Sequence, residues 1–427
     1  MPDSIPFTAR SHSTPYALAV LGGGAAGGAA ARQAARQGTR VALLVPDEAE
    51  AEPGASGDFA RAVRRLQAQR GLRPPPLPID EPRIDVFPGP VWFSRYRTVS
   101  VGGVEVRFGR AVVATGAEAG AVAVAGAEEA EPLRPHELDR LDGPPQRLAV
   151  LGSDGEACFW AQQMRRLGSE VYLIAAGPRL LEASDEQAAQ IVARRLEAEG
   201  VCVRTGCEDV ALDRTGNRRG VLIGRGERRE KLLADEVLVC PEPRPRVAGL
   251  ALATAAVAYS ERGIGVDDRL RTSERHVFAA GGACGPHFTS PEAEEATGRL
   301  AARNALAWVP RRLGRCVVPR CTPTDPPIVE LGLRPAEAAA AGIDVEPRRF
   351  EFRATEAADP DEVQGYLALL VGPRGRVVGA TIAATGSEEL ALPLMLLMSR
   401  GLPLRILGAI TPCRSGRARL LAALAEK

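Results

Sequence analysis

Three glycines near the N-terminus have the spacing of a diphosphate-binding turn. They lie in Ala17–Val45, ALAVLGGGAAGGAAARQAARQGTRVALLV, which is predicted to form a strand, a tight turn, a small-residue helix and a second strand. In this pattern one glycine makes the turn, one lets the diphosphate approach the backbone, and one lets the helix pack closely on the strand. The helix N-terminus adds free N–H groups and partial positive charge. The residues assigned to this nucleotide site are Gly22, Gly24, Ala25, Ala26 and Gly27.

A second strand, turn and helix begin at Arg147, but their turn reads Gly152-Ser-Asp154-Gly-Glu156-Ala157. Asp154 stands where a glycine would let a diphosphate approach, and it adds both bulk and negative charge. Like charges about 4 Å apart repel by on the order of 1 kcal/mol in water and by several times more near a protein surface. The sequence therefore does not favour NAD(P) binding at this turn, although an altered loop using Gly155 is an alternative.

Two cysteine pairs have the C-x4-C spacing of a redox-active dithiol, which requires the start of a helix. Cys202 and Cys207 lie in a predicted strand and turn, where residues five apart are separated by roughly 16 Å. A disulfide requires Cα atoms within about 7 Å. Cys316 and Cys321 flank a proline in a predicted extended segment. We interpret both pairs as ordinary thiols, with redox pairing as the alternative.

The composition is that of a soluble, multidomain globular protein. The 427 residues are 45% hydrophobic and 25% charged, with a formal net charge of +1, so neither nucleic acid nor an anionic membrane is an expected partner. The first 17 residues have no apolar segment of signal-peptide length, and no run of about 18 apolar residues occurs. Eight cysteines in so long a chain do not indicate a disulfide framework, and a cytoplasmic location is expected.

Further along the chain, hairpin and sheet patterns appear. Gly102-Gly103 separates two alternating segments and predicts a β-hairpin. After about Val317, PPIVELGL, RRFEFRATE, GYLALLV and RVVGATIAA are typical of antiparallel strands. Helices are predicted at Pro335–Ala341 and Glu388–Arg400, so this part reads as an α+β module.

Several landmarks together resemble the flavin-dependent pyridine nucleotide-disulfide oxidoreductases, in particular the mercuric reductase and dihydrolipoamide dehydrogenase branch. They are the first glycine turn, the strands leading to Ala114-Thr115-Gly116, the segment GIGVDDRLRTSERHVFAAGG, and RCTPTDPPIVELGL. The resemblance implies an α/β fold with two doubly wound Rossmann-like domains, of FAD type and NAD(P) type, plus a C-terminal α+β dimerisation domain. It implies FAD as cofactor and a homodimer. The implied domains are 1–145 and 266–316 for FAD, 146–265 for NAD(P), and 317–427 for dimerisation.

The flavin ligands implied by the resemblance are partly altered. The carboxylate that normally accepts hydrogen bonds from the FAD ribose falls on Val45, and Asp47 is the alternative acceptor. The third flavin motif, usually A-x-G-D, ends at Gly282 in place of the Asp. After the strand that follows the second turn, Ala175 and Ala176 replace the residue that would read the NAD(P) ribose. The further flavin-site residues implied are Asp47, Ala114, Thr115, Gly116, Gly281 and Gly282.

The reactive groups of the family are also missing. The family carries its C-x4-C soon after the second strand, but residues 47–58 contain no cysteine and none precedes Cys158. A thiolate is the nucleophile and electron carrier in this chemistry. The His, Tyr or Glu base expected near the C-terminus is absent from Ile410–Ala418, where Cys413 is interpreted as structural. We assign no catalytic residue and no metal ligand.

Three functions are compatible with these observations. The first is a flavoprotein homologue without disulfide or mercuric reductase activity that retains FAD or adenine-nucleotide binding. The second is an active FAD-dependent oxidoreductase that reduces a quinone, oxygen or another acceptor directly at the flavin. The third is a non-catalytic dimeric scaffold that uses apolar surfaces of the C-terminal module.

Overall fold

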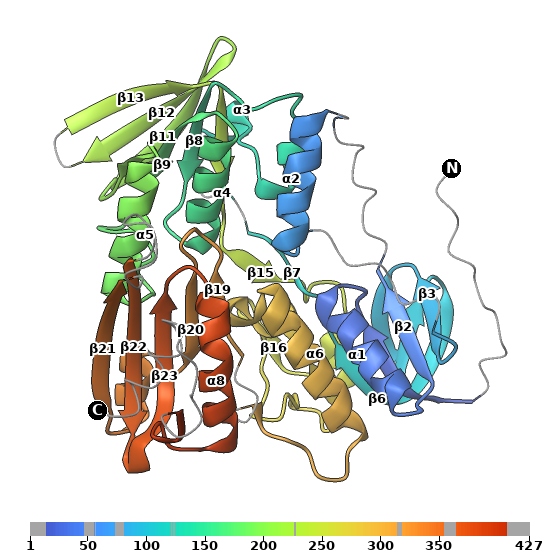
Figure 1. Ribbon diagram of the computed structural model, residues 1–427. Coiled ribbons are helices and arrows are strands. Elements are labelled where there is room, and N and C mark those ends of the chain that lie inside the picture. The colour runs from blue at the N-terminus through green and yellow to red at the C-terminus, as the bar shows by residue number, and fades with distance from the viewer. Residues whose placement is uncertain are drawn as a thin grey trace. The chain divides into compact units, whose positions relative to one another are not determined.

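In the computed structural model (Figure 1), the chain folds into two compact units. The described residues are 14–46, 55, 57–72, 81–120, 122, 124–225, 228–313, 318–353 and 364–407. The first unit comprises Met1–Gly54, Arg61–Gly120 and Glu242–Cys316, and the second comprises Ala55–Ala60, Ala121–Pro241 and Val317–Lys427. Helix α2 (Asp58–Gln69) contains residues of both. Each unit is therefore assembled from segments that are distant in the sequence.

The first unit is built on a seven-stranded sheet in the order β3-β2-β1-β6-β5-β4, with β18 also paired to β6. Strands β3, β2, β1, β6 and β18 are parallel, whereas β4 and β5 form an antiparallel extension. The bounds are β1 Tyr16–Leu21, β2 Val41–Val45, β3 Ile84–Pro88, β4 Val91–Arg95, β5 Thr98–Val101, β6 Val104–Val113 and β18 Val277–Ala279. Short pairs are formed by β7 (Ala117–Ala119) with β15 (Pro243–Pro245) and by β16 (Tyr259–Ser260) with β17 (Gly263–Ile264).

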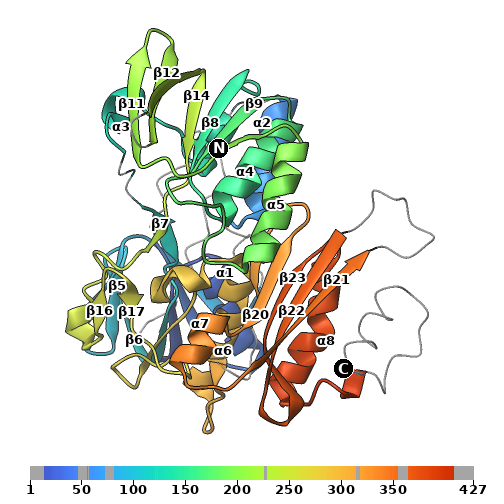
Figure 2. The same ribbon diagram turned by 90° about the vertical axis from the view of Figure 1, so that its left-hand side faces the viewer.

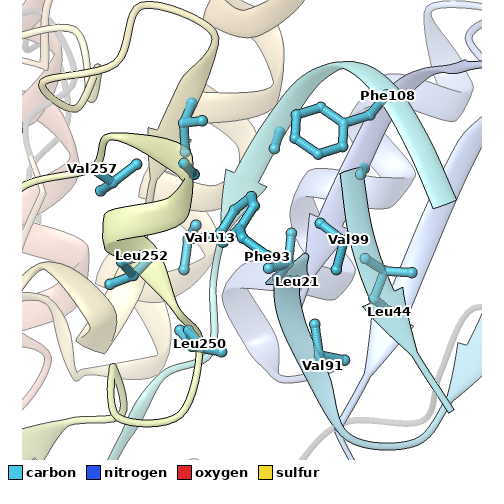
Figure 3. Packing of buried hydrophobic residues seen from close by; sticks show 14 of the residues in the cluster. Leu21, Leu44, Val91, Phe93, Val99, Phe108, Val113, Leu250, Leu252 and Val257 are labelled. Carbon is cyan, nitrogen blue, oxygen red and sulfur yellow. The ribbon is translucent and has the colours of Figure 1, made fainter. Parts of the chain in front are cut away.

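Apolar side chains cover both faces of this sheet, which explains why β1, β2 and β18 are almost entirely hydrophobic. On one face, Leu21, Phe93 and Val113 belong to a buried cluster with Leu250 and Leu252 of the segment that contains the 3-10 helix η2 (Leu252–Ala255), as Figure 3 shows. The other face is covered by α1 (Ala25–Arg36) and α6 (Pro291–Leu306).

Helices α1 and α6 approach each other closely because both carry small residues at their contact. A Cβ atom on Gly298 would lie 2.1 Å from the Ala26 carbonyl oxygen, so no larger residue fits without a shift. Alanines fill most of the remaining contact and favour the helical conformation themselves. The two helices consequently hold the first turn of α1 at a defined place over the sheet.

The second unit begins with a four-stranded parallel sheet in the order β10-β9-β8-β14. Its strands are β8 Arg147–Leu151, β9 Glu170–Ile174, β10 Cys202–Arg204 and β14 Glu236–Val239, and its helices are α3 Ala127–Ala130, α4 Gly155–Arg166 and α5 Glu186–Ala198. An antiparallel meander follows β10, with β11 Asp209–Thr215, β12 Arg218–Arg225 and β13 Arg228–Ala234. A buried apolar cluster joins the sheet and the meander.

The C-terminal module of the second unit is a five-stranded antiparallel sheet in the order β19-β20-β23-β22-β21. Its elements are β19 Arg320–Thr322, β20 Ile328–Gly332, α7 Pro335–Ala340, β21 Glu346–Arg353, β22 Gln364–Gly372, β23 Arg376–Ala383 and α8 Ser387–Arg400. Figure 2 shows α8 lying along this sheet, where its apolar side enters a buried cluster with β20, β22 and β23. The strands and both helices predicted for this region are confirmed.

Three other predictions can be compared with the structure. The hairpin at Gly102-Gly103 is confirmed, because β5 and β6 pair across it and both glycines have positive φ. Cys202 lies on β10 and Cys207 follows the strand, and no disulfide joins them. Cys316 lies outside the described residues.

In the described part of the chain, no helix has the length and apolar character needed to cross a membrane.

Candidate functional site

Gly22 makes the turn between β1 and α1 and brings it against the Ala114 segment. Its φ is +118°, and a Cβ atom there would lie 2.1 Å from the Ala114 carbonyl oxygen. The Gly22 N–H donates to the Leu44 carbonyl oxygen at 2.8 Å, which ties the turn to β2. A residue with a side chain fits neither the backbone conformation nor the space.

The other two glycines of the pattern have different surroundings. A Cβ atom on Gly27 would lie 1.9 Å from the Gly22 carbonyl oxygen, so this glycine is required for the helix to sit on the turn. A Cβ atom on Gly24 would meet nothing within 4 Å. The space above Gly24 is therefore open, as the approach of a diphosphate requires.

Helix α1 leaves its N-terminus available. Gly24 is the N-cap residue and makes no side-chain cap, and the first turn contains no acidic residue. The first N–H groups of a helix have no partner within it, and they carry the positive end of the helix dipole. Ala25, Ala26 and Gly27 supply these groups at the open side of the turn, which is the arrangement that binds phosphate.

The Ala114-Thr115-Gly116 motif lies directly beneath this turn. The Ala114 N–H donates to the Leu21 carbonyl oxygen at 2.8 Å. Thr115 Oγ1 donates to the Arg246 carbonyl oxygen at 2.6 Å, and the Arg246 N–H donates to the Gly116 carbonyl oxygen at 3.0 Å. Gly116 has a φ of +75°, which glycine adopts without strain. Thr115 and Gly116 are thus hydrogen-bonded to Arg246, which belongs to the segment Glu242–Cys316 of the first unit.

Gly281 and Gly282 complete the site from the 3-10 helix η3 (Gly281–Cys284). Gly281 has a φ of +65°, and its Cβ position lies 2.9 Å from Ala26 Cβ. A Cβ atom on Gly282 would lie 2.8 Å from the Ala117 backbone nitrogen and 3.0 Å from the Gly116 carbonyl carbon. The three predicted motifs therefore converge in one place, and the backbone leaves no room for an Asp at position 282.

Glu294 is a residue of this site that the sequence patterns did not identify. Its carboxyl group accepts a hydrogen bond from the Gly282 N–H, and burial raises the pKa of Glu294 to about 7. The sequence contains a signal for it, because Glu294 precedes Gly298 by one helical turn on the side of α6 that carries buried Ala301 and Ala305. A carboxyl on an apolar helix face requires an explanation.

The second glycine turn is closed by its own side chains. Asp154 is the N-cap residue of α4, and its Oδ1 accepts a hydrogen bond from the Ala157 N–H at 2.9 Å. Glu156 Oε1 accepts from Trp160 Nε1 at 2.7 Å. The Asp154 carboxylate thus occupies the helix terminus where a diphosphate would bind.

Two other segments crowd the same turn. The Cβ position of Gly155 lies 3.0 Å from Thr322 Oγ1, and the Leu181 N–H donates to the Ser153 carbonyl oxygen at 2.7 Å. The altered loop that would bind a ligand through Gly155 therefore has little free space. At the end of β9, Ala175 is buried and Ala176 is exposed, and neither carries a polar side chain.

Comparison with known proteins identifies the family. A family model described as pyridine nucleotide-disulphide oxidoreductase matches residues 16–301, and the model of the corresponding dimerisation domain matches residues 318–410. The chain belongs to the pyridine nucleotide-disulfide oxidoreductase family. Its fold class, predicted from sequence as α/β with a C-terminal dimerisation domain, is confirmed.

The individual relatives match only part of their own length. Mercuric reductase from Bacillus cereus is 29% identical over 328 residues, which cover 76% of this chain and 52% of that protein. Dihydrolipoyl dehydrogenase from Thermus scotoductus is 36% identical over 220 residues, which cover 51% of this chain and 47% of that protein. The matches thus span about half the length of these curated relatives.

Among solved structures, the HOCl-induced flavoprotein disulfide reductase RclA from Escherichia coli superposes with a TM-score of 0.77 at 23% sequence identity. The match covers 96% of this chain and 100% of that chain. LpdA from Mycobacterium tuberculosis gives a TM-score of 0.76 at 20% identity and covers 96% of this chain and 98% of that one. At these identities the comparison shows a shared fold.

The family is FAD-dependent and also uses NAD(P). The first glycine turn fits the diphosphate of FAD, because Gly24 leaves open space beside an uncapped helix N-terminus. The ribose end fits less well, since Val45 at the end of β2 has no polar side chain, and Asp47 lies outside the described residues. The residues present therefore support the diphosphate part of the flavin site.

The first site has no thiol where the resemblance places the family's redox dithiol. No cysteine precedes Cys158, and Cys158 is fully buried on α4, where burial raises the pKa of its thiol. A buried thiol in apolar surroundings is inert. The Ile410–Ala418 segment and Cys413, interpreted above as lacking the family base, lie outside the described residues.

Proposed function

We propose that this chain binds FAD or another adenine nucleotide at the α1 turn and does not reduce disulfides or mercuric ion by the dithiol route. The observation that carries the proposal is the convergence of three flavin motifs at an open, uncapped helix N-terminus, in a chain without any cysteine before Cys158. The open turn would serve as the binding surface, whereas the thiolate that the dithiol reaction requires has no counterpart before Cys158.

The binding roles follow from the geometry of the turn. The N–H groups of Ala25, Ala26 and Gly27 would hold the diphosphate, and Gly24 would admit it. Thr115 would keep the neighbouring motif rigid through its bond to Arg246. When bound, FAD supplies two-electron redox chemistry in its isoalloxazine ring.

We further propose that the second glycine turn does not bind NAD(P). A bound diphosphate would have to displace the Asp154 carboxylate from the Ala157 N–H and would face its negative charge. Thr322 and Leu181 reduce the space beside the same turn. This turn therefore serves the stability of the second unit rather than a cofactor.

A second candidate function is an FAD-dependent oxidoreductase that passes electrons directly to a quinone or oxygen. The retained first site favours it, because such a reaction needs a bound flavin but no dithiol. Oxidation of NADH or NADPH in the presence of FAD, measured with several acceptors, would support this candidate. An absence of turnover with every donor and acceptor would contradict this candidate and leave nucleotide binding as the only proposed function of the site.

We also propose that the chain forms a homodimer through residues 317–427, since residues 318–410 match the family's dimerisation domain. Leu392 and Leu396, one turn apart on α8, are 65% and 58% exposed and offer an apolar surface. Sedimentation analysis should give a dimer. A monomer at all accessible concentrations would contradict both the homodimer and the scaffold hypothesis.

The binding proposal is tested by absorbance and titration. The purified protein should show a flavin band near about 450 nm, or bind added FAD by calorimetry. Gly24→Leu should abolish binding without unfolding the protein, because φ at Gly24 is −66° and its side-chain position is open. Gly265→Leu is the matched control, since Gly265 is exposed and its Cβ position is equally open. Binding that survives Gly24→Leu would overturn the proposed site.

A further inference from the structure

The carboxyl group of Glu294 lies beside Gly281 and Gly282 in the first site. The point that a Cβ atom on Gly281 would occupy lies 2.9 Å from Ala26 Cβ and 3.5 Å from Glu294 Oε1. Ala26 belongs to the first turn of α1, where the free N–H groups are. The Glu294 carboxyl and the first turn of α1 therefore both lie beside Gly281.

This carboxyl reaches the site by a different route from the family's Asp. Position 282 is occupied by glycine and has no room for a side chain beside Gly116 and Ala117. Glu294 approaches from α6 instead, and its carboxyl group accepts a hydrogen bond from the Gly282 N–H. A carboxyl is thus present next to η3 although the third flavin motif lacks one.

We propose that Glu294 is a ligand-binding residue of the first site and that the site takes up a proton together with the diphosphate. In the neutral form, the Glu294 O–H donates a hydrogen bond to a diphosphate oxygen. In the ionised form, the carboxylate repels the same oxygens in a partly buried place. If Glu294 is ionised before binding, the proton comes from solvent. The proposal rests on the proposed function, because it concerns the same site.

Among the residues that the structure describes, none forms an ion pair with Glu294. Burial is the cause of its raised pKa, which is about 7, and the Gly282 N–H is the group that opposes it. The described elements packed against α6 are α1, β1, β6, β18, η3 and η4 (Pro286–Phe288). Their described titratable groups are Arg32 and Arg36 on α1, Tyr16 on β1, Glu105, Arg107 and Arg110 on β6, and Cys284 on η3. On α6 itself they are Glu292, Glu295, Arg299 and Arg303.

Burial raises the pKa of Glu294 and the hydrogen bond from the Gly282 N–H lowers it, and neither cause is a charged side chain. Cys284 does not titrate near neutral pH, because burial raises its thiol pKa to about 12. Arg299 pairs with Glu295 at 2.7 Å. Among the described groups around this site, Glu294 is the one whose pKa burial brings to about 7.

The test measures affinity against pH with ligands of constant charge. FAD and ADP-ribose are suitable because both phosphates of each are esterified and stay ionised throughout the range. Because the ligand binds the form in which the Glu294 carboxyl is neutral, the affinity of the native protein for either ligand should fall about tenfold between pH 6 and pH 8. Glu294→Gln keeps a neutral donor, so it should bind nearly as tightly as the native protein at pH 6 and show no such fall. Glu295→Gln on the same helix is the control and should keep the native pH slope.

Proton uptake gives a second readout that needs no variant. At pH 8, calorimetric titration of the native protein in two buffers with different ionisation enthalpies should show about one proton taken up per ligand. A native affinity independent of pH, or an unchanged slope in Glu294→Gln, would overturn the inference while leaving the binding function intact. If neither ligand binds at any pH, the proposed function fails and the inference fails with it.

Discussion

Asp154 Oδ1 accepts a hydrogen bond from the Ala157 backbone N–H at 2.9 Å, at the helix terminus where the second glycine turn of this fold would receive a diphosphate. At the equivalent place in the first turn, Gly24 offers no side chain and the first turn of α1 contains no acid. The protein thus contains two similar helix termini, one closed by its own carboxylate and one open. The difference determines which of them is able to bind an external anion.

The Asp154 cap should contribute to stability. Asp154→Ala removes the acceptor of the Ala157 N–H, and loss of an N-cap typically costs about 1 kcal/mol. We expect a lower thermal midpoint for this variant by calorimetry. Asp154→Asn should stay near the native midpoint, because Asn caps helices as well as Asp. Equal midpoints for the Ala and native proteins would show that the carboxylate does not act as a cap.

Gly298 should be essential for the contact between α1 and α6. In Gly298→Ala the new methyl would lie 2.1 Å from the Ala26 carbonyl oxygen, so the helices must separate. Overpacking of this kind costs about 1–3 kcal/mol. We expect a lower thermal midpoint and weaker FAD binding, since Ala26 lies in the phosphate-binding turn. The exposed Gly265→Ala should change neither, and a native-like Gly298→Ala would contradict the close packing.

Thr115 should position the Ala114-Thr115-Gly116 motif through its hydroxyl group. Thr115→Val keeps the shape but removes the hydrogen bond to the Arg246 carbonyl oxygen, which is 2.6 Å long. The expected loss is about 1 kcal/mol of unfolding free energy. Thr115→Ser keeps the hydroxyl and should lose less. If denaturation shows the Ser variant to be the less stable of the two, packing of the methyl group and not the hydrogen bond determines stability here.

Glu294 should make the stability of the ligand-free protein depend on pH. Burial raises its pKa to about 7 in the folded state, above the ordinary value of 4.5, so between these values the folded state binds more protons than the unfolded state. Stability therefore falls as pH rises from about 4.5 to about 7 and then levels off. This pKa shift corresponds to a loss of at most roughly 3 kcal/mol in the free energy of unfolding.

The neutral variant Glu294→Gln should lack this component. Its thermal midpoint should exceed that of the native protein at pH 8, and the difference should shrink towards pH 5. Glu295→Gln, an exposed neighbour paired with Arg299, should behave like the native protein. A constant difference between Glu294→Gln and native protein across this range would contradict a pKa raised by burial.

Local patterns predicted most of the elements. Gly102-Gly103 predicted a hairpin because two-residue turns of this kind require positive φ at both positions, which glycine permits. The spacing of Gly22, Gly24 and Gly27 predicted the turn of α1 because its steric requirements lie within a few residues of chain. The charge at Asp154 was also visible in sequence, but its role as a helix cap depended on the position at which α4 begins.

Sequence alone determined the family, the two strand–turn–helix patterns and the lack of any cysteine before Cys158, because these are matters of residue type and short spacing. Only the tertiary structure decided that Glu294 adjoins Gly281 and Gly282, and that Thr322 adjoins Gly155. These neighbours are far apart in the chain or on different elements. Contacts between these residues depend on how closely helices and strands pack, and short sequence patterns do not determine that packing.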